Sequence, residues 1–257
     1  MSAALEFRDV SVATAGGRLL LSNVSLALEE GTVTAILGRS GSGKTTLLRT
    51  ANRMMKATRG EVCVGGKNIA EVDAVNLRRQ MGYVIQETGL FPHFNVERNV
   101  GIVLEAEGQP RERRGKRSSE LLQQVGLDPA SFAGRYPHQL SGGQRQRVGL
   151  ARALAVEPKI LLMDEPFGAL DPLTRAEMQD MLLDLLKRLH TTVLLVTHDL
   201  DEALYLAQRV VLVSDGKMAA DLPRDEFLKS EQREIVEYAR AFRRTPAAAS
   251  SSKDRRP

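Results

Sequence analysis

Residues 38–45 have the types and spacing of a loop that cradles phosphate groups. Glycines let successive backbone N–H groups converge on an anion, and a helix that begins at the end of the loop directs its positive end to the same place. A lysine adds a positive charge for the β- and γ-phosphates of a nucleotide, and a hydroxyl beside it can bind Mg²⁺. The apolar run 33–37 before the loop and the helical periodicity of residues 46–54 after it supply the strand and helix that this motif requires. We therefore predict a triphosphate-binding loop made of Gly38, Arg39, Ser40, Gly41, Ser42, Gly43, Lys44 and Thr45, continued by Thr46.

Two carboxylates follow another apolar run. Residues 160–163 are aliphatic, and Asp164 and Glu165 come directly after them. The carboxyl ends of parallel strands form the edge of a sheet at which nucleotides bind. Asp164 is therefore suited to hold Mg²⁺, and Glu165 is suited to polarise an attacking water. An Asp-Glu pair after a strand is common by chance, but beside a complete phosphate loop it predicts hydrolysis of the bound triphosphate.

A second glycine-rich segment opens a helix in the middle of the chain. It consists of Ser141, Gly142, Gly143 and Gln144, and residues 145–155 after it have helical periodicity. By the same dipole argument, this helix N-terminus is a second anion site. Three further polar residues stand beside the ends of predicted strands or helices, namely Gln86, Asp171 and His198.

The scaffold for these residues is predicted by hydrophobic periodicity. Short β-branched and aliphatic runs alternate with longer helical segments, which is typical of an α/β domain around a largely parallel sheet. Asp171 and Pro172 supply a cap and a first-turn proline for one long helix. Short alternating segments predict a small antiparallel sheet beside the main one, in residues 1–30 and 60–70. Residues 89–157 predict a helical insertion, and the core strands are predicted at residues 33–37, 82–86, 160–164, 193–197 and 210–214.

The composition excludes several classes of protein. The chain has 257 residues, a formal net charge of +4, one cysteine, no tryptophan and 4% aromatic residues. A single cysteine excludes an internal disulfide framework. Balanced charge and few aromatic side chains argue against a nucleic-acid partner. No apolar run approaches the ~18 residues of a membrane span, and the N-terminus shows no secretory signal pattern.

The motifs together resemble the ATPase subunit of an ABC transporter. The phosphate loop, Gln86, the segment Ser141–Gln144 (the signature segment), the Asp164-Glu165 pair, Asp171 and His198 occur in the order of that family. The resemblance spans residues 4–220 and implies an α/β fold: a P-loop NTPase (RecA-like) core with a small antiparallel β subdomain. It also implies an α-helical signature subdomain at about residues 89–157. Beyond it we expect a C-terminal helical extension at 221–244 and a disordered tail at 245–257.

The resemblance implies roles that spacing alone does not supply. In this family two ATPase subunits face each other head to tail, and each ATP lies between the phosphate loop of one and the signature segment of the other. Ser141 and Gly143 are then expected to contact the γ-phosphate of the partner's nucleotide. Gln86 is expected to contact Mg²⁺ and the attacking water, His198 to complete the hydrolysis site with Glu165, and Asp171 to lie across the dimer interface.

The family also implies partners, a location and a solute. An integral membrane permease and, indirectly, a solute-binding protein are expected, with this chain peripheral on the cytoplasmic face of the cell membrane. Finer resemblance points to importers of quaternary-amine osmoprotectants (glycine betaine, carnitine or choline), and lies in residues 53–60, 77–100, 167–175 and 199–203. Importers of amino acids, sulfonates or polyamines remain open as alternatives.

A soluble ABC ATPase of translation or DNA repair is disfavoured because only one motif set is present. A scaffold without turnover is disfavoured because Glu165 and His198 are both retained.

One feature of the family is missing. Members usually carry an aromatic residue upstream of the phosphate loop that stacks on adenine, but residues 10–16 contain neither Tyr nor Phe. Thr14 or Val12 would occupy that place. Loss of stacking forfeits about 1–3 kcal/mol, so we expect weak discrimination between ATP and GTP and a high micromolar or weaker affinity for ATP.

Overall fold

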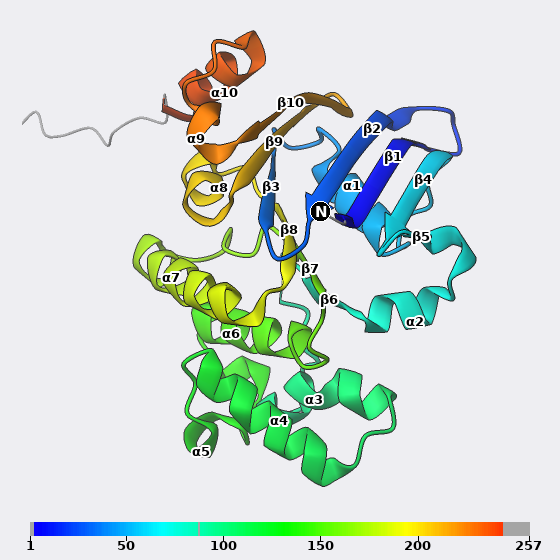
Figure 1. Cartoon of the computed structure of the whole chain (residues 1–257). Coiled ribbons are helices and arrows are strands. Elements are labelled where there is room, and N and C mark those ends of the chain that lie inside the picture. Colours follow the sequence, from blue (N-terminus) through cyan, green and yellow to red (C-terminus); the bar gives the residue numbers. More distant parts are fainter. Residues whose placement is uncertain (1–2, 87, 244–257) are drawn as a thin grey trace, which may run out of the picture.

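The main sheet of the protein joins strands that are far apart in the sequence. The computed structural model describes residues 3–86 and 88–243. Its six-stranded sheet has the order β10-β9-β3-β8-β7-β6, in which β10 is antiparallel to β9 and the other neighbours are parallel (Figure 1). The strands are β3 (Val33–Leu37), β6 (Met81–Val84), β7 (Ile160–Asp164), β8 (Thr192–Val196), β9 (Arg209–Ser214) and β10 (Lys217–Pro223).

The apolar strands of this sheet are covered on both faces. Every residue of β3, β7 and β8 is buried. Ala35 and Leu37 belong to one core cluster, whereas Ile36 between them belongs to another on the opposite face. Successive side chains of a strand point to opposite faces, so an unbroken apolar run is what a doubly covered strand requires.

A second, smaller sheet is antiparallel, as predicted. Its order is β2-β1-β4-β5, with β1 (Ala3–Ala13), β2 (Leu19–Glu29), β4 (Arg59–Val64) and β5 (Lys67–Asn68). Gly65 and Gly66 form the turn between β4 and β5 with φ of 53° and 77°, which is the left-handed conformation that glycine adopts without strain. This sheet lies on the side of the main sheet that carries α1 (Figure 1).

Helices cover the main sheet and lead away from its strand ends. They are α1 (Lys44–Ala51), α2 (Ala74–Arg79), α7 (Pro172–Leu189), α8 (Leu200–Leu206), α9 (Arg224–Phe227) and α10 (Arg233–Arg243). Asp171 caps α7 by accepting a hydrogen bond from the Thr174 amide at 3.1 Å, and Pro172 is the first residue of this helix. The cap and the proline predicted from the sequence therefore stand where the helix begins.

The insertion between β6 and β7 is helical. It contains α3 (Val96–Ala106), α4 (Arg111–Gln124), α5 (Pro129–Phe132) and α6 (Gly142–Ala153), and the structure shows no strand there in the described residues. In Figure 1 this subdomain forms the end of the molecule opposite the small sheet and α10. No helix among residues 3–86 and 88–243 combines the length and apolar character that crossing a bilayer would take.

Several boundaries differ from the sequence-based prediction. β10 was not predicted as a strand, and it runs to Pro223, through the domain boundary expected at residue 220. Its sequence has no β-branched residue, so pairing with β9 rather than local propensity makes it a strand. β6 ends at Val84, short of the predicted residue 86, and α6 begins at Gly142 rather than at residue 145. The tail expected to be disordered lies outside the described residues.

Candidate active site

The phosphate loop joins β3 to α1 and needs glycine at two positions where other chain segments approach closely. Gly38 and Gly43 have φ of 155° and 108°. A Cβ atom on Gly38 would lie 2.3 Å from the carbonyl oxygen of Val213, and one on Gly43 would lie 2.8 Å from that of Leu20. Both glycines are therefore required by backbone packing as well as by the shape of the loop.

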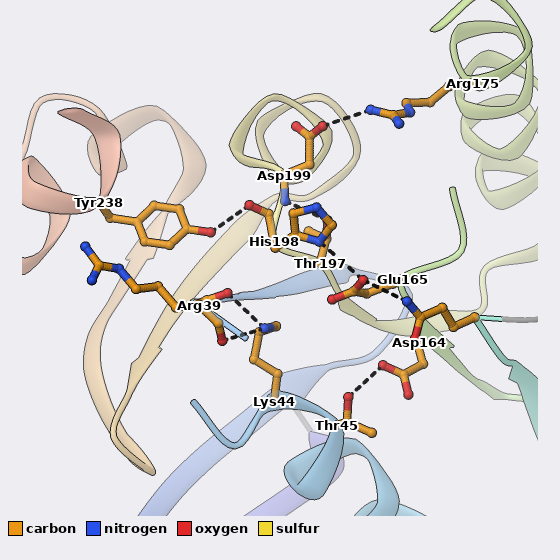
Figure 2. A network of polar contacts seen from close by, with 12 residues as sticks. Arg39, Lys44, Thr45, Asp164, Glu165, Arg175, Thr197, His198, Asp199 and Tyr238 are labelled. Carbon is orange, nitrogen blue, oxygen red and sulfur yellow. Dashed lines mark hydrogen bonds and ion pairs between the residues drawn. The ribbon is translucent and has the colours of Figure 1, made fainter. Parts of the chain in front are cut away.

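Lys44, the first residue of α1, is held across this loop. Only 5% of the residue is exposed, and its Nζ donates hydrogen bonds to the carbonyl oxygens of Gly38 at 2.8 Å and Arg39 at 3.0 Å. Burial lowers the pKa of Lys44, and the nearby carboxylates of Glu165 and Asp164 oppose that shift. The ammonium group thus stands within the curve of the loop (Figure 2), where a phosphate would meet it.

Thr45 and Asp164 offer oxygen ligands at one point. The hydroxyl of Thr45 donates a hydrogen bond to Oδ1 of Asp164 at 3.0 Å. Asp164 is 6% exposed, and burial raises the pKa of its carboxyl while the bond from Thr45 opposes the rise. Mg²⁺ prefers oxygen ligands and is usually bound by one or two carboxylates together with substrate phosphates. One hydroxyl and one buried carboxyl group beside a phosphate loop fit that donor set.

Glu165 is turned toward two other polar side chains. Its φ of 45° is uncommon for a residue other than glycine and is typical of functional sites. Its amide donates to the carbonyl oxygen of Val196 at 2.9 Å. Its Oε2 accepts a hydrogen bond from Nε2 of Gln86 at 3.3 Å and lies 3.3 Å from Nδ1 of His198 (Figure 2). The structure therefore gathers two of the predicted residues, Gln86 and His198, around the carboxylate of a third, Glu165.

The loop that carries His198 is fixed through its neighbours. Thr197 accepts a hydrogen bond from the Asp199 amide at 3.0 Å. The Asp199 carboxylate pairs with Arg175 of α7 at 3.2 Å, and Arg175 also donates to the carbonyl oxygen of Leu170 at 3.3 Å. The backbone around His198 is thus tied to the start of α7, although 59% of the His198 side chain is exposed.

The signature segment forms a separate group with the start of α7. Ser141 caps α6 by accepting from the Gln144 amide at 3.2 Å, and Gln144 Oε1 accepts from the Ser141 amide at 3.0 Å. A Cβ atom on Gly143 would lie 2.5 Å from Cγ2 of Thr174, the residue that Asp171 caps. Across the described parts of the chain, no hydrogen bond or ion pair joins residues 141–144 to the phosphate loop. The predicted residues therefore form two groups.

Some contacts of the site have no signal in the sequence. Arg152 of α6 donates to the carbonyl oxygens of Thr88 at 2.7 Å and Gly89 at 2.6 Å, which ties the signature helix to the segment after Gln86. Asn99 is fully buried and bonds the backbone of the segment before α3. Because the partners are backbone groups, no pairing of residue types could have indicated these roles.

The structure corrects one of the two candidates for contact with adenine. Val12 is 2% exposed and belongs to the core cluster under the small sheet, so it cannot face a base. Thr14 is exposed, and its hydroxyl accepts a hydrogen bond from the Arg18 amide at 3.2 Å. Of the two residues, only Thr14 is available at that surface.

A parallel sheet with a phosphate loop after β3 and a carboxylate pair after β7 defines a P-loop NTPase. The chain matches the protein family described as ABC transporter over residues 21–168, and it belongs to that family. It is similar to the choline transport ATP-binding protein OpuBA of Bacillus subtilis, with 43% identity over 91% of this chain and 61% of the relative. It is also similar to the glycine betaine uptake system ATP-binding protein YehX of Escherichia coli, with 45% identity over 83% of this chain and 69% of the relative. The chain spans about 60% of the length of the first relatives it matches.

Solved structures support the same fold. A dimeric ATP-binding cassette in a post-hydrolysis state, bound to ADP and Pi, matches with a TM-score of 0.77 and 33% identity over 86% of this chain and 98% of that one. The cbiO1 protein of Clostridium perfringens, part of the ABC transporter complex cbiONQ, matches with a TM-score of 0.82 and 27% identity over 94% of this chain and 96% of that one. The fold predicted from the sequence is confirmed.

Proposed function

We propose that this chain is the ATP-hydrolysing subunit of an ABC importer that takes up a quaternary-amine osmoprotectant such as glycine betaine, carnitine or choline. The observation that carries the hydrolytic part is the convergence of Gln86 and His198 on the carboxylate of Glu165, beside the hydrogen-bonded pair Thr45 and Asp164. In this proposal the ATPase domain extends to Pro223, where the last strand of the sheet ends.

The phosphate loop binds the nucleotide in this mechanism. Its backbone amides and the N-terminus of α1 surround the phosphates, and Lys44 exchanges its two carbonyl contacts for phosphate oxygens. Thr45 and Asp164 would hold Mg²⁺, with Gln86 as a further ligand. The ion would supply positive charge that neutralises the phosphates. The loop residues proposed to bind are Gly38, Arg39, Ser40, Gly41, Ser42, Gly43, Lys44, Thr45 and Thr46.

Hydrolysis is a transfer of the γ-phosphoryl group to water. Glu165 accepts a hydrogen bond from the water and polarises it for in-line attack. Gln86 and His198, each 3.3 Å from the Glu165 carboxylate, orient the water and the γ-phosphate. The bond from the γ-phosphorus to the bridging oxygen breaks as the new bond to the water oxygen forms, and Glu165 takes up the proton that the water releases. ADP and phosphate remain.

A second ATPase subunit completes the site. Ser141, Gly142, Gly143 and Gln144 form the N-terminus of α6 near Asp171. Ser141 and Gly142 are exposed there, while Gly143 is buried and Gln144 half-buried. The exposed end of the segment is therefore available to a nucleotide held by another subunit. The similar post-hydrolysis cassette is dimeric. ATP then favours the closed dimer because it contacts both subunits, and loss of the γ-phosphate lets them separate.

An exposed aromatic segment, residues 91–94, is the proposed contact with the membrane permease. Phe91 is 42% exposed, its ring packs edge-on to His93, and Arg98 lies 3.8 Å above the Phe94 ring. This segment follows Gln86 in the chain, and Asn99 bonds its backbone. A movement of Gln86 on ATP binding can therefore be passed to the exposed residues of the segment. The permease, a solute-binding protein and a position on the cytoplasmic face of the membrane belong to the proposal, which the names of the similar transport proteins support.

ATP turnover by the purified chain tests the hydrolytic part. Glu165→Gln should retain ATP binding, elute as a dimer with Mg·ATP and lose at least ~100-fold in turnover, the effect of removing a general base. Lys44→Ala should lose nucleotide binding itself. Glu226→Gln, at an exposed residue of α9, is the matched control and should behave as wild type. Near-normal turnover by Glu165→Gln would remove this residue from the mechanism.

Uptake and co-purification test the transport part. Affinity purification of the chain from gently solubilised membranes should recover a permease. Cells whose only copy carries Glu165→Gln should fail to accumulate labelled glycine betaine, carnitine and choline. If these cells kept uptake of the three quaternary amines and lost uptake of amino acids, sulfonates or polyamines, the importer would belong to one of those classes.

A further inference from the structure

Helix α10 brings a tyrosine to the site from beyond the sheet. α10 follows β10 and α9, and in Figure 2 Tyr238 reaches from it toward His198 on the side where Arg39 lies. The hydroxyl of Tyr238 donates a hydrogen bond to the backbone carbonyl oxygen of His198 at 2.7 Å. No motif of the phosphate loop, the carboxylate pair or the signature segment includes this residue.

Tyr238 also stands beside the phosphate loop. It lines one cavity together with Arg39, Ser40 and Ser42 of that loop. Burial raises the pKa of Tyr238 to about 12, so the phenol is protonated at neutral pH and donates to the His198 carbonyl. One side chain of α10 thus stands beside both the phosphate loop and the segment after β8.

The surroundings keep Tyr238 in place. Ile235, one turn earlier on α10, is 1% exposed, and the ring of Tyr238 packs against the main core cluster. α10 and the phosphate loop together line a cavity of about 300 Å³, with Arg39, Ser40 and Ser42 on one side and Glu234, Glu237 and Tyr238 on the other. The helix is therefore a wall of the region beside the phosphate loop.

The imidazole of His198 depends on its backbone for its position. Its side chain is 59% exposed, so packing does little to fix it. The contacts that restrain the backbone there include the bond from Tyr238 to the His198 carbonyl, the bond from the Asp199 amide to Thr197 and the bond from the Thr197 amide to the Ile36 carbonyl at 3.1 Å. Loss of the hydrogen bond from Tyr238 would leave the backbone of His198 less restrained. That backbone places the imidazole 3.3 Å from Glu165.

We propose that Tyr238 is a positioning residue of the hydrolysis site, whose hydroxyl holds the His198 carbonyl from a helix that borders the phosphate loop. This inference rests on the proposed ATPase function. It predicts that the chemical step, and not nucleotide binding, depends on the hydroxyl, because the Tyr238 hydroxyl bonds the His198 carbonyl and not a group proposed to bind the phosphates.

The substitution Tyr238→Phe removes the hydroxyl and keeps the ring. For the full-length chain we expect kcat to fall about 3- to 10-fold, which matches the net worth of one hydrogen bond, while KM for ATP stays within about twofold. Tyr205→Phe is the matched control: the Tyr205 hydroxyl bonds Asp180 of α7, and its loss should leave both constants unchanged. An unchanged kcat or a raised kcat would overturn the proposal. A raised KM for ATP with no change in kcat would also overturn it.

A measurement that needs no turnover separates positioning from general stability. Hydrogen–deuterium exchange in the peptide that spans residues 194–201 should be faster in Tyr238→Phe than in wild type and Tyr205→Phe, at equal melting temperatures. An unchanged exchange rate in this peptide would show that the Tyr238 hydroxyl does not restrain the His198 backbone. If Glu165→Gln kept the turnover of the wild type, that result would contradict the proposed ATPase function instead. The exchange comparison would still decide whether Tyr238 restrains the His198 backbone.

Discussion

Thr45 and Asp164 are joined by a hydrogen bond of 3.0 Å although 119 residues separate them in the chain. The bond connects the end of the phosphate loop to the carboxyl end of β7. It therefore fixes the distance between the residues proposed to bind phosphate and the strand that ends beside Glu165. The buried Asp164 carboxyl accepts this bond at the cost of its own hydration.

The first prediction concerns Mg²⁺. Asp164→Asn keeps an oxygen that can accept from Thr45 but removes the carboxylate charge. We expect the Mg²⁺ concentration for half-maximal ATP turnover to rise at least about tenfold, since Mg²⁺ depends on the charge of its few protein ligands. The melting temperature should hold or rise, because burial of an ionised carboxylate is unfavourable. An unchanged Mg²⁺ requirement would exclude Asp164 as a ligand.

The second prediction concerns adenine. Thr14 is the exposed residue at the place where the family resemblance predicts an aromatic ring. Thr14→Tyr should raise the affinity for ATP about tenfold, within the ~1–3 kcal/mol that base stacking supplies, and Thr14→Val should not. Titration of wild type with ATP and GTP should give comparable affinities. A strong preference of the wild type for ATP would show that another group recognises the base.

The third prediction concerns the exposed aromatic segment. Asn99 bonds the carbonyl oxygens of Phe91, Phe94 and Asn95 and the Phe91 amide, at 2.7–3.1 Å, from a fully buried position. Asn99→Ala removes these bonds and leaves the Phe91 amide and the Phe94 carbonyl without the partner that the structure gives them, so it should cost about 1–3 kcal/mol of unfolding free energy. Chemical denaturation measures this loss, and Asn76→Ala on the exposed face of α2 is the control.

The same variant tests the proposed contact with the permease. If the segment 91–94 docks there, Asn99→Ala should reduce co-purification of the permease more than it reduces ATP turnover by the isolated chain. An equal reduction in both would indicate that Asn99 serves stability alone.

The sequence predicted the parts of this fold that depend on local pattern. β3, β7 and the helix begun by Asp171 and Pro172 stand where apolar runs and capping residues placed them. It did not predict β10, whose strand form depends on β9. It also missed Arg152 and Tyr238, because each bonds backbone carbonyl groups that any residue type presents. Such contacts are set by tertiary structure and leave no pattern of residue types.

The last prediction uses a buried carboxyl group next to the His198 loop. Glu202 of α8 is 4% exposed, and burial together with the nearby Asp199 carboxylate raises its pKa from 4.5 to about 8. A bond from Thr197 opposes the rise. Between these two pH values the folded chain holds a proton that the unfolded chain releases, so stability must fall as the pH rises from about 5 to 8, by up to ~1.4 kcal/mol per pH unit.

Glu202→Gln cannot titrate and should remove this fall. Its melting temperature should therefore vary less with pH than that of wild type, and above pH 8 the variant should be the more stable protein. Glu107→Gln, at the exposed end of α3, is the control and should follow the wild-type curve. Parallel curves for wild type and Glu202→Gln from pH 5 to 8 would show that Glu202 is ionised in the folded chain and that the attraction of Arg175, which lowers its pKa, outweighs its burial.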